Sequence, residues 1–150
     1  MSIDFFEERY ADCVTEITEL AARHAAEVRP HDGLPYSPSL PTYEALDRAG
    51  ALYVATARAQ RELVGYLLAV VMPQHLHHGI KWASGDGVFL RKDWRRPRLA
   101  DRILAFAEDG LRVRGVVLMT LSVAPDDPGF GRMLASRNYY LSGLSWSRRL

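Results

Sequence analysis

The chain has 150 residues, the size of one domain that buries roughly two thirds of its unfolded surface. With 48% hydrophobic and 25% charged residues, it is too apolar for a disordered chain. The single cysteine, Cys13, excludes an intramolecular disulfide, a cysteine-rich zinc site and an iron–sulfur cluster. A net charge of +1 argues against wholesale nucleic-acid binding. No apolar run approaches the roughly 20 residues of a membrane span, and the N-terminus lacks a signal-peptide pattern, so we expect a soluble cytoplasmic protein.

The first part of the chain predicts a long amphipathic helix. Apolar residues recur every three or four positions from Ile3 to Val28, and Ser2 is a plausible N-cap. Pro30 and the residues that follow it end this helix. A proline-rich loop then continues to Pro41, and a short helical turn is expected over 43–48.

The middle of the chain predicts strands. The segments 51–59 and 63–72 are apolar and partly alternating, and the three residues between them are few enough for a hairpin. A short buried strand is expected over 87–91. The segment 73–87, which contains three histidines close together, shows neither a helix pattern nor a strand pattern.

The last third predicts two helices and two strands. Pro97 suits the first position of a helix whose apolar residues run from Leu99 to Leu111. A strand is expected over 116–123. A short helix over 130–137 and an alternating strand over 140–149 complete the chain. We find no linker or internal repeat, so the sequence predicts one α/β domain over 1–150.

Basic residues gather just before the second long helix. Six of the 19 lysines and arginines lie between positions 91 and 102: Arg91, Lys92, Arg95, Arg96, Arg98 and Arg102. Free N–H groups at a helix start, together with arginine side chains, suit a phosphate-bearing ligand. A solvated helix face is the alternative interpretation, and nucleic acid is a third and less favoured one.

Several short stretches resemble one family when their order and spacing are taken together. The stretches are His24-Ala25-Ala26-Glu27-Val28, Tyr43-Glu44-Ala45-Leu46-Asp47, Leu63-Val64-Gly65-Tyr66, His75-Leu76-His77-His78, Asp86-Gly87-Val88-Phe89-Leu90, Asp93-Trp94-Arg95, Leu104-Ala105-Phe106-Ala107-Glu108 and the ending from Tyr139 to Leu150. In this respect the sequence is similar to the GNAT acyltransferase superfamily, and most like small GNAT-like proteins encoded by phages and prophages.

The resemblance implies a mixed, twisted sheet of about five to seven strands with helices on both faces. Two parallel strands would splay apart and admit acetyl-CoA, whose pantetheine arm would pair with the backbone of Val88, Phe89 and Leu90. The pyrophosphate would lie on the pattern Arg/Gln-x-x-Gly-x-Gly/Ala, which maps onto residues 95–100. The residues expected to contact it are Arg95, Arg96, Arg98, Leu99 and Ala100.

Two residues of the phosphate pattern, Pro97 and Arg98, weaken the match to the family, and Pro97 removes one N–H donor. Arg98 stands where the family has glycine, which lets the backbone approach the pyrophosphate closely. Two outcomes are open: Arg98 turns outward and pairs with a CoA phosphate, or the site no longer binds CoA.

The family reaction transfers an acetyl group directly to an amine and needs a base. Asp86 is the leading candidate, although it is also a plausible cap of a turn. Glu27 and His24 are the next candidates. They are three residues apart on a helix, so their side chains can meet. The alternative interpretation of His24 is a hydrogen-bonded core residue. Leu134 occupies the position of the usual tyrosine acid, which leaves Tyr139 as the nearby candidate.

The acceptor amine is expected near Tyr43 and near one of His77 and His78, the other of which faces solvent. Three histidines in four residues cannot all point inward from a strand, so we expect no metal site. Cys13 lies on the apolar stripe of the first helix and is not expected to act as a nucleophile.

Two functions follow from the resemblance. The first is an acetyl-CoA-dependent N-acetyltransferase that acts on a primary amine through a ternary complex, as a monomer or homodimer. The alternative is a GNAT-fold phage accessory or virion-associated protein that has lost catalysis and binds a host or phage protein.

Overall fold

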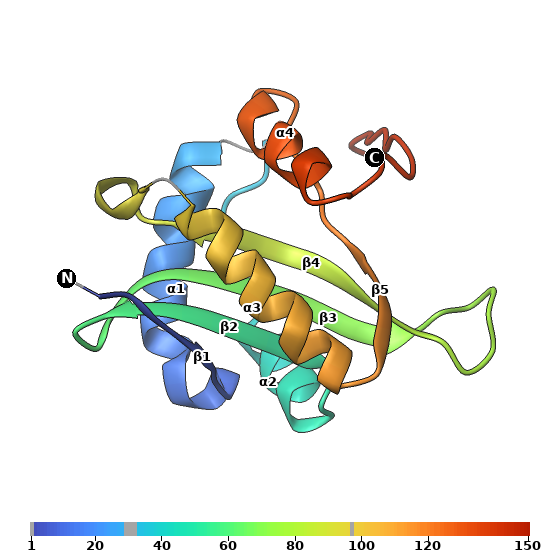
Figure 1. Cartoon of the computed structure of the whole chain (residues 1–150), viewed down its shortest axis with the longest axis horizontal. Helices are drawn as coiled ribbons and strands as arrows, with labels where there is room; N and C mark the ends of the chain where they lie inside the picture. Colours follow the sequence, from blue (N-terminus) through green and yellow to red (C-terminus); the bar gives the residue numbers. More distant parts are fainter. Residues whose placement is uncertain (1, 29–32, 97) are drawn as a thin grey trace.

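The computed structural model describes residues 2–28, 33–96 and 98–150 and shows a single sheet covered by helices (Figure 1). The strands, in sheet order, are β1 (Asp4–Glu7), β2 (Leu52–Ala59), β3 (Glu62–Pro73), β4 (Lys81–Leu90) and β5 (Val116–Thr120). The helices are α1 (Tyr10–Val28), α2 (Leu40–Arg48), the 3-10 turn η1 (Lys92–Trp94), α3 (Leu99–Val113) and α4 (Pro128–Ser136). Neighbouring strands are antiparallel from β1 to β4, whereas β4 and β5 are parallel. The expected mixed α/β sheet is confirmed.

Helices cover both faces of this sheet, as expected. In Figure 1, α3 crosses one face and α1 and α2 lie against the other. Successive residues of β2 alternate between two cores: Tyr53 and Ala55 pack on the α3 side, and Leu52 and Val54 on the α1 side. A strand covered on both faces reads as a continuous apolar run, which explains the weak alternation of this segment.

The hairpin between β2 and β3 is confirmed. Its two turn residues, Gln60 and Arg61, have φ values of 48° and 78°, so both adopt the left-handed conformation that matches the twist of the flanking strands. The partner strands register from Leu52 opposite Val70 to Ala59 opposite Glu62, with one irregularity near Ala57.

The expected helix start is wrong. Residues Asp4–Glu7 form β1, which pairs with the edge of β2, and α1 begins only at Tyr10, so Ser2 caps no helix. The apolar spacing in the sequence runs on from the strand into the helix because both elements bury residues. Ile3 is buried on the α3 side of the sheet, and Tyr10 is buried on the opposite side. The expected helix end at Pro30 and the expected helical Pro97 lie outside the described residues.

The expected C-terminal strand is also wrong. Residues 137–150 contain no helix or strand, and Trp146 is 92% exposed. Apolar residues stand on both faces of the expected alternation, Leu141 on one and Leu144 and Trp146 on the other, so neither face offers enough apolar surface to offset the ordering of the backbone. The part of the chain that the structure describes therefore leaves β5 at the edge of the sheet.

Strand β4 is longer than expected and loses its parallel partner half-way. Its register with β5 runs from Lys81 opposite Val116 to Ser84 opposite Thr120, and β4 then continues to Leu90 paired with β3 and not with β5. The strands splay where the side chain of Leu121 lies over Gly85: a Cβ at Gly85 would be 2.3 Å from Leu121 Cδ2. The expected splayed pair is present.

None of the helices in the described ranges has the length and apolar character that a membrane crossing requires.

Gly65 keeps the free part of β4 close to β3. A Cβ at this glycine would lie 2.9 Å from the carbonyl oxygen of Phe89 and 2.3 Å from Leu90 Cδ2. We expect Gly65→Ala to lower the free energy of unfolding by roughly 1–3 kcal/mol, because the added methyl overpacks this contact. Chemical denaturation measures the loss. Gly143→Ala, in open space, is the control; an equal effect in both variants would contradict the close-approach argument.

Candidate active site

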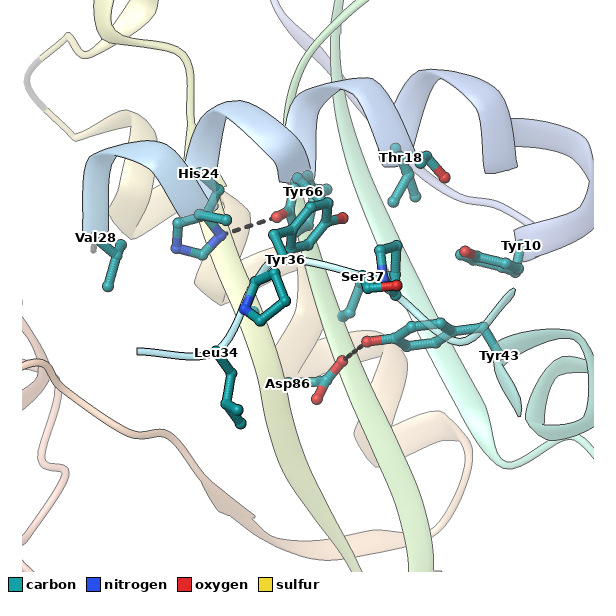
Figure 2. Close-up of a pocket in the computed structure, with 17 residues that line it drawn as sticks. Tyr10, Thr18, His24, Val28, Leu34, Tyr36, Ser37, Tyr43, Tyr66 and Asp86 are labelled. Carbon is teal, nitrogen blue, oxygen red and sulfur yellow. Dashed lines mark hydrogen bonds between the residues drawn. The ribbon is translucent and has the colours of Figure 1, made fainter. Parts of the chain in front are cut away.

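A cavity of about 380 Å³ opens on the α1 side of the sheet, beside the free half of β4 (Figure 2). One wall is the inner face of α1, and the floor is formed by β3 and β4. The segment 34–38 and the start of α2 line the remaining side. The cavity therefore lies where helix, loop and splayed strand meet, which is a common setting for ligand sites.

Asp86 enters this cavity through a bulge in β4. Gly87 pairs with Leu68 and Gly85 with the next residue of β3, so Asp86 is the extra residue between them. Bulges re-aim single side chains, and here the Asp86 carboxylate accepts a short hydrogen bond from the Tyr43 hydroxyl (Figure 2). Burial, reinforced by the neighbouring Asp86 carboxylate, raises the pKa of Tyr43 far above its ordinary range, so Tyr43 stays protonated and donates.

His24 faces the same cavity from α1. Its Nδ1 lies 2.9 Å from the Tyr66 hydroxyl, and its ring stacks on Phe89 with centroids 4.8 Å apart. Burial lowers the pKa of His24 below its usual 6.5, an effect that the neighbouring Arg95 strengthens and Glu27 opposes. The imidazole is therefore neutral at pH 7 and offers a ring nitrogen as a proton acceptor.

Glu27 and Arg95 form an ion pair instead of serving the cavity directly. The Arg95 guanidinium donates to Glu27 and to the carbonyl oxygen of Leu90, the latter at 2.9 Å, and lies over the Phe89 ring at 5.4 Å. His24 takes Tyr66 as its partner, so the expected pairing of His24 with Glu27 gives way to two separate contacts. Arg95 thus joins α1 to the end of β4.

The start of α3 keeps an unusual backbone conformation. Arg98 is the N-cap and has φ 68° and ψ 0°, the left-handed region that favours glycine. This is the position at which the phosphate pattern has glycine. The left-handed turn is therefore retained with an arginine, at a conformational cost of roughly 1–2 kcal/mol.

The six clustered basic residues divide into two groups. Arg91 pairs with Glu62 and Asp93, Arg95 with Glu27, and Arg102 lies over the Phe5 ring. Among the described contacts, no ion pair engages the exposed side chains of Lys92, Arg96 and Arg98; Arg96 lies over the Trp94 ring. Arg96 and Arg98 are thus available to an anion at the helix start, whereas the N–H of Leu99 already donates to the carbonyl oxygen of Arg96 at 3.2 Å.

The structure does not bring Tyr139 to the cavity. Its hydroxyl donates to Glu108 on α3 at 2.9 Å and lies 3.5 Å from the sulfur of Met119 on β5. Arg137 pairs with the same glutamate, and Leu134 is 6% exposed in the core. This end of the chain therefore holds α4 against α3 and β5.

His77 and His78 also lie away from the cavity. They are exposed in the loop between β3 and β4, and residues 81–85 of β4 separate them from Asp86 (Figure 1). Of the expected acceptor-side residues, Tyr43 alone is among those that line the cavity. In the described ranges, no group of three or more His, Cys, Asp or Glu side chains is arranged to hold a metal ion.

Three tyrosines in the cavity wall were not anticipated: Tyr10, Tyr36 and Tyr66. Tyr10 stacks on Tyr43 with centroids 5.3 Å apart, and Tyr66 is the partner of His24. The available signal was a hydroxyl inside the buried apolar strand around Tyr66, because a buried hydroxyl needs a partner. Tyr36 stood in a loop without periodicity, and only the folded chain places it.

Comparison with known proteins shows the fold. No protein-family model and no curated protein sequence matches the chain. The structure is similar to ribosomal-protein-alanine N-acetyltransferase from Brucella melitensis biovar Abortus 2308, with a TM-score of 0.77, 22% identity, and coverage of 100% of this chain and 99% of the other. The chain has the N-acetyltransferase fold.

Two further structures extend this likeness across other acceptors. The aminoglycoside acetyltransferase meta-AAC0020 from an uncultured soil metagenomic sample has a TM-score of 0.80 at 13% identity, covering 99% of this chain and 96% of its own. AAC(6')-Iy, solved with a bisubstrate analog of CoA and acetylneamine, has a TM-score of 0.75 at 14% identity, covering 100% and 99%. These structural neighbours are GNAT acetyltransferases, and the likeness of this chain to their fold extends over nearly its whole length.

The buried His24 predicts a pH-dependent stability. The pKa of His24 is lower in the folded protein than in the unfolded chain. Between that lowered value and about 6.5 the unfolded chain therefore binds more protons, and the free energy of unfolding decreases as the pH decreases. We expect acidification from about pH 7.5 to 5.5 to lower the melting temperature of the wild type more than that of His24→Gln. Thermal denaturation across this range measures both slopes, with the exposed His75→Gln as control. Parallel slopes for wild type and His24→Gln would contradict the prediction.

Proposed function

We propose that the protein is an N-acetyltransferase that transfers an acetyl group from acetyl-CoA to a primary amine within a ternary complex. The observation that carries this proposal is the juxtaposition of the splayed β4 with the cavity that contains Asp86. An acyl donor bound along the free edge of β4 and an amine bound in the cavity would meet at the bulge. A structural neighbour solved with a CoA bisubstrate analog supports the choice of acyl-CoA.

The donor site would combine a strand edge with a helix start. The backbone of Val88, Phe89 and Leu90 would hold the pantetheine arm, since β5 leaves this stretch of β4 unpaired. The phosphates would lie at the N-terminus of α3, where Arg96 and Arg98 are exposed. Arg95 would act indirectly, by holding Leu90 and Phe89 in place.

The acceptor site would use Asp86 as ammonium anchor and base. The Tyr43 hydroxyl occupies one carboxylate oxygen of Asp86, Oδ2, and the other oxygen remains to accept an N–H of the amine. Asp86 takes the ammonium proton so that the nitrogen lone pair is free to attack. In the tautomer whose Nδ1–H donates to the Tyr66 hydroxyl, the neutral His24 would offer Nε2 as a second acceptor.

Bound acetyl-CoA supplies the acetyl group as a thioester; a C–N bond forms as the C–S bond breaks, the nitrogen releases its second proton to solvent, and the thiolate leaves. In this chain solvent would protonate that thiolate. Leu134 is buried where the family has its tyrosine, and the Tyr139 hydroxyl is bonded to Glu108. A thiolate is a good leaving group at neutral pH and does not require an acid.

A second function is favoured by two differences between this chain and the family pattern. Leu134 in place of the acid and Arg98 in place of glycine fit a protein that keeps the fold but binds a protein partner instead of catalysing transfer. We keep a phage or prophage origin, a cytoplasmic location and a monomeric or homodimeric state as proposals. Ligand binding distinguishes the two functions.

Acetyl-CoA is expected to stabilise the protein. At about 100 times its dissociation constant it adds roughly 2.7 kcal/mol, a rise of about 5–10 °C in melting temperature for a domain of this size. Arg98→Glu, which places a negative charge at the helix start, should reduce the rise, whereas Arg98→Gly should retain it because glycine suits the left-handed turn. Thermal shift with acetyl-CoA, CoA and an adenine nucleotide tests this. No shift at millimolar acetyl-CoA would contradict the enzyme proposal.

Asp86→Asn is expected to lower kcat/KM for amine acetylation by about 100- to 10,000-fold, because it removes the base while keeping the side-chain shape. Tyr43→Phe removes only the hydroxyl that Asp86 accepts from, so its loss should be about tenfold. Thiol release from acetyl-CoA measures both. If Asp86→Asn lost no more activity than Tyr43→Phe, another group would be the base.

A further inference from the structure

We infer that the cavity selects a small primary amine that carries one positive charge on an apolar body. This inference rests on the proposed function, since it names the acceptor that the same cavity would bind. Three features of the cavity carry it: its charge, its walls and its closure by the segment 34–38.

The described lining of the cavity offers a single negative charge. Among the described residues that line it, Asp86 is the one acid and His24 the one basic group, and His24 is neutral because burial lowers its pKa. Glu27, near the same end of α1, is paired with Arg95 and does not line the cavity. One ammonium would therefore be neutralised by Asp86. A second cation on the same molecule would lose its hydration without gaining a partner.

The walls are aromatic and aliphatic. Four tyrosines line the cavity, and Tyr10 stacks on Tyr43 next to the Asp86 carboxylate (Figure 2). Tyrosine faces attract an ammonium and also pack against an apolar body. Ile17 and Leu68 add aliphatic surface to the same space. A hydrocarbon or aromatic ring attached to the amine would thus be desolvated against matching surface.

The closure favours a small molecule over a polypeptide. Figure 2 shows the segment with Leu34, Tyr36 and Ser37 lying across the cavity opposite α1. A volume of about 380 Å³ lies near the lower end of the range for small-molecule pockets. A peptide acceptor would need to continue past this segment, whereas a compact amine would be contained by it.

The test measures amine binding and acetyl transfer separately. Calorimetry compares 2-phenylethylamine with spermidine and with a short peptide that has an N-terminal alanine, each added to the wild-type protein without acetyl-CoA. We expect 2-phenylethylamine to bind at least tenfold more tightly than the other two. Equal or tighter binding of spermidine or of the peptide would overturn the inference, as would the absence of binding by all three.

Three variants locate the site. Asp86→Asn should weaken 2-phenylethylamine binding at least tenfold and leave the neutral 2-phenylethanol unaffected. Ala25→Leu, which fills the cavity from α1, should weaken both compounds, whereas the next residue is exposed and Ala26→Leu should change neither. Melting temperatures verify that each variant is folded. If Ala25→Leu and Ala26→Leu were equivalent, the amine would bind elsewhere and the inference would fail.

Thiol release from acetyl-CoA distinguishes this inference from the proposed function. Binding of 2-phenylethylamine without thiol release would support the selectivity of the cavity and contradict acetyl transfer. Thiol release driven by spermidine or by the peptide, and not by 2-phenylethylamine, would support acetyl transfer and overturn the selectivity.

Discussion

The site depends on the separation of two parallel strands. β4 pairs with β5 only as far as Ser84, and in the described part of the chain its remaining residues have β3 as their neighbour on one side and no strand on the other. Leu121 fills the space above Gly85 at the point of separation, where any larger residue on β4 would meet it. The bulge at Asp86 follows at once and turns a carboxylate toward the cavity. An unpaired backbone edge and an acid are thus created together.

The second requirement is the placement of α1 against the sheet. Arg58 on β2 donates to Glu8 before the helix and to Glu16 within it, at distances from 2.6 to 2.9 Å. The buried Thr56 donates to the same Glu8, which fixes the junction between β1 and α1. Because a bidentate arginine pair is directional, it sets the angle of the helix. Further along α1, His24 then meets Tyr66 and Phe89 on the sheet.

At the start of α3, an arginine has a backbone conformation that is usual for glycine. Arg98 adopts the left-handed conformation that glycine adopts without cost, so the turn is kept and its strain is offset by the packing of the helix that follows. Leu99, Ile103 and Leu104 are buried in the core on that side of the sheet. Strain held in place by surrounding structure is frequent at ligand sites, and the guanidinium adds a positive charge at the helix start.

The sequence by itself determined the elements whose signal is local. The apolar period of α3, the hairpin between two apolar segments and the apolar runs of the central strands follow from residue spacing, and the resemblance supplied the expectation that Asp86 lies near the site. The structure shortened the expected three-residue turn to two residues, because Glu62 pairs with Ala59. Tertiary structure decided the rest. Residues 4–7 became a strand because β2 offered an edge, and residues 140–149 did not because no apolar face held them. The partners of His24, Glu27 and Tyr139, and the position of Tyr36, were decided by contacts between segments far apart in the chain, and no local period encodes such contacts.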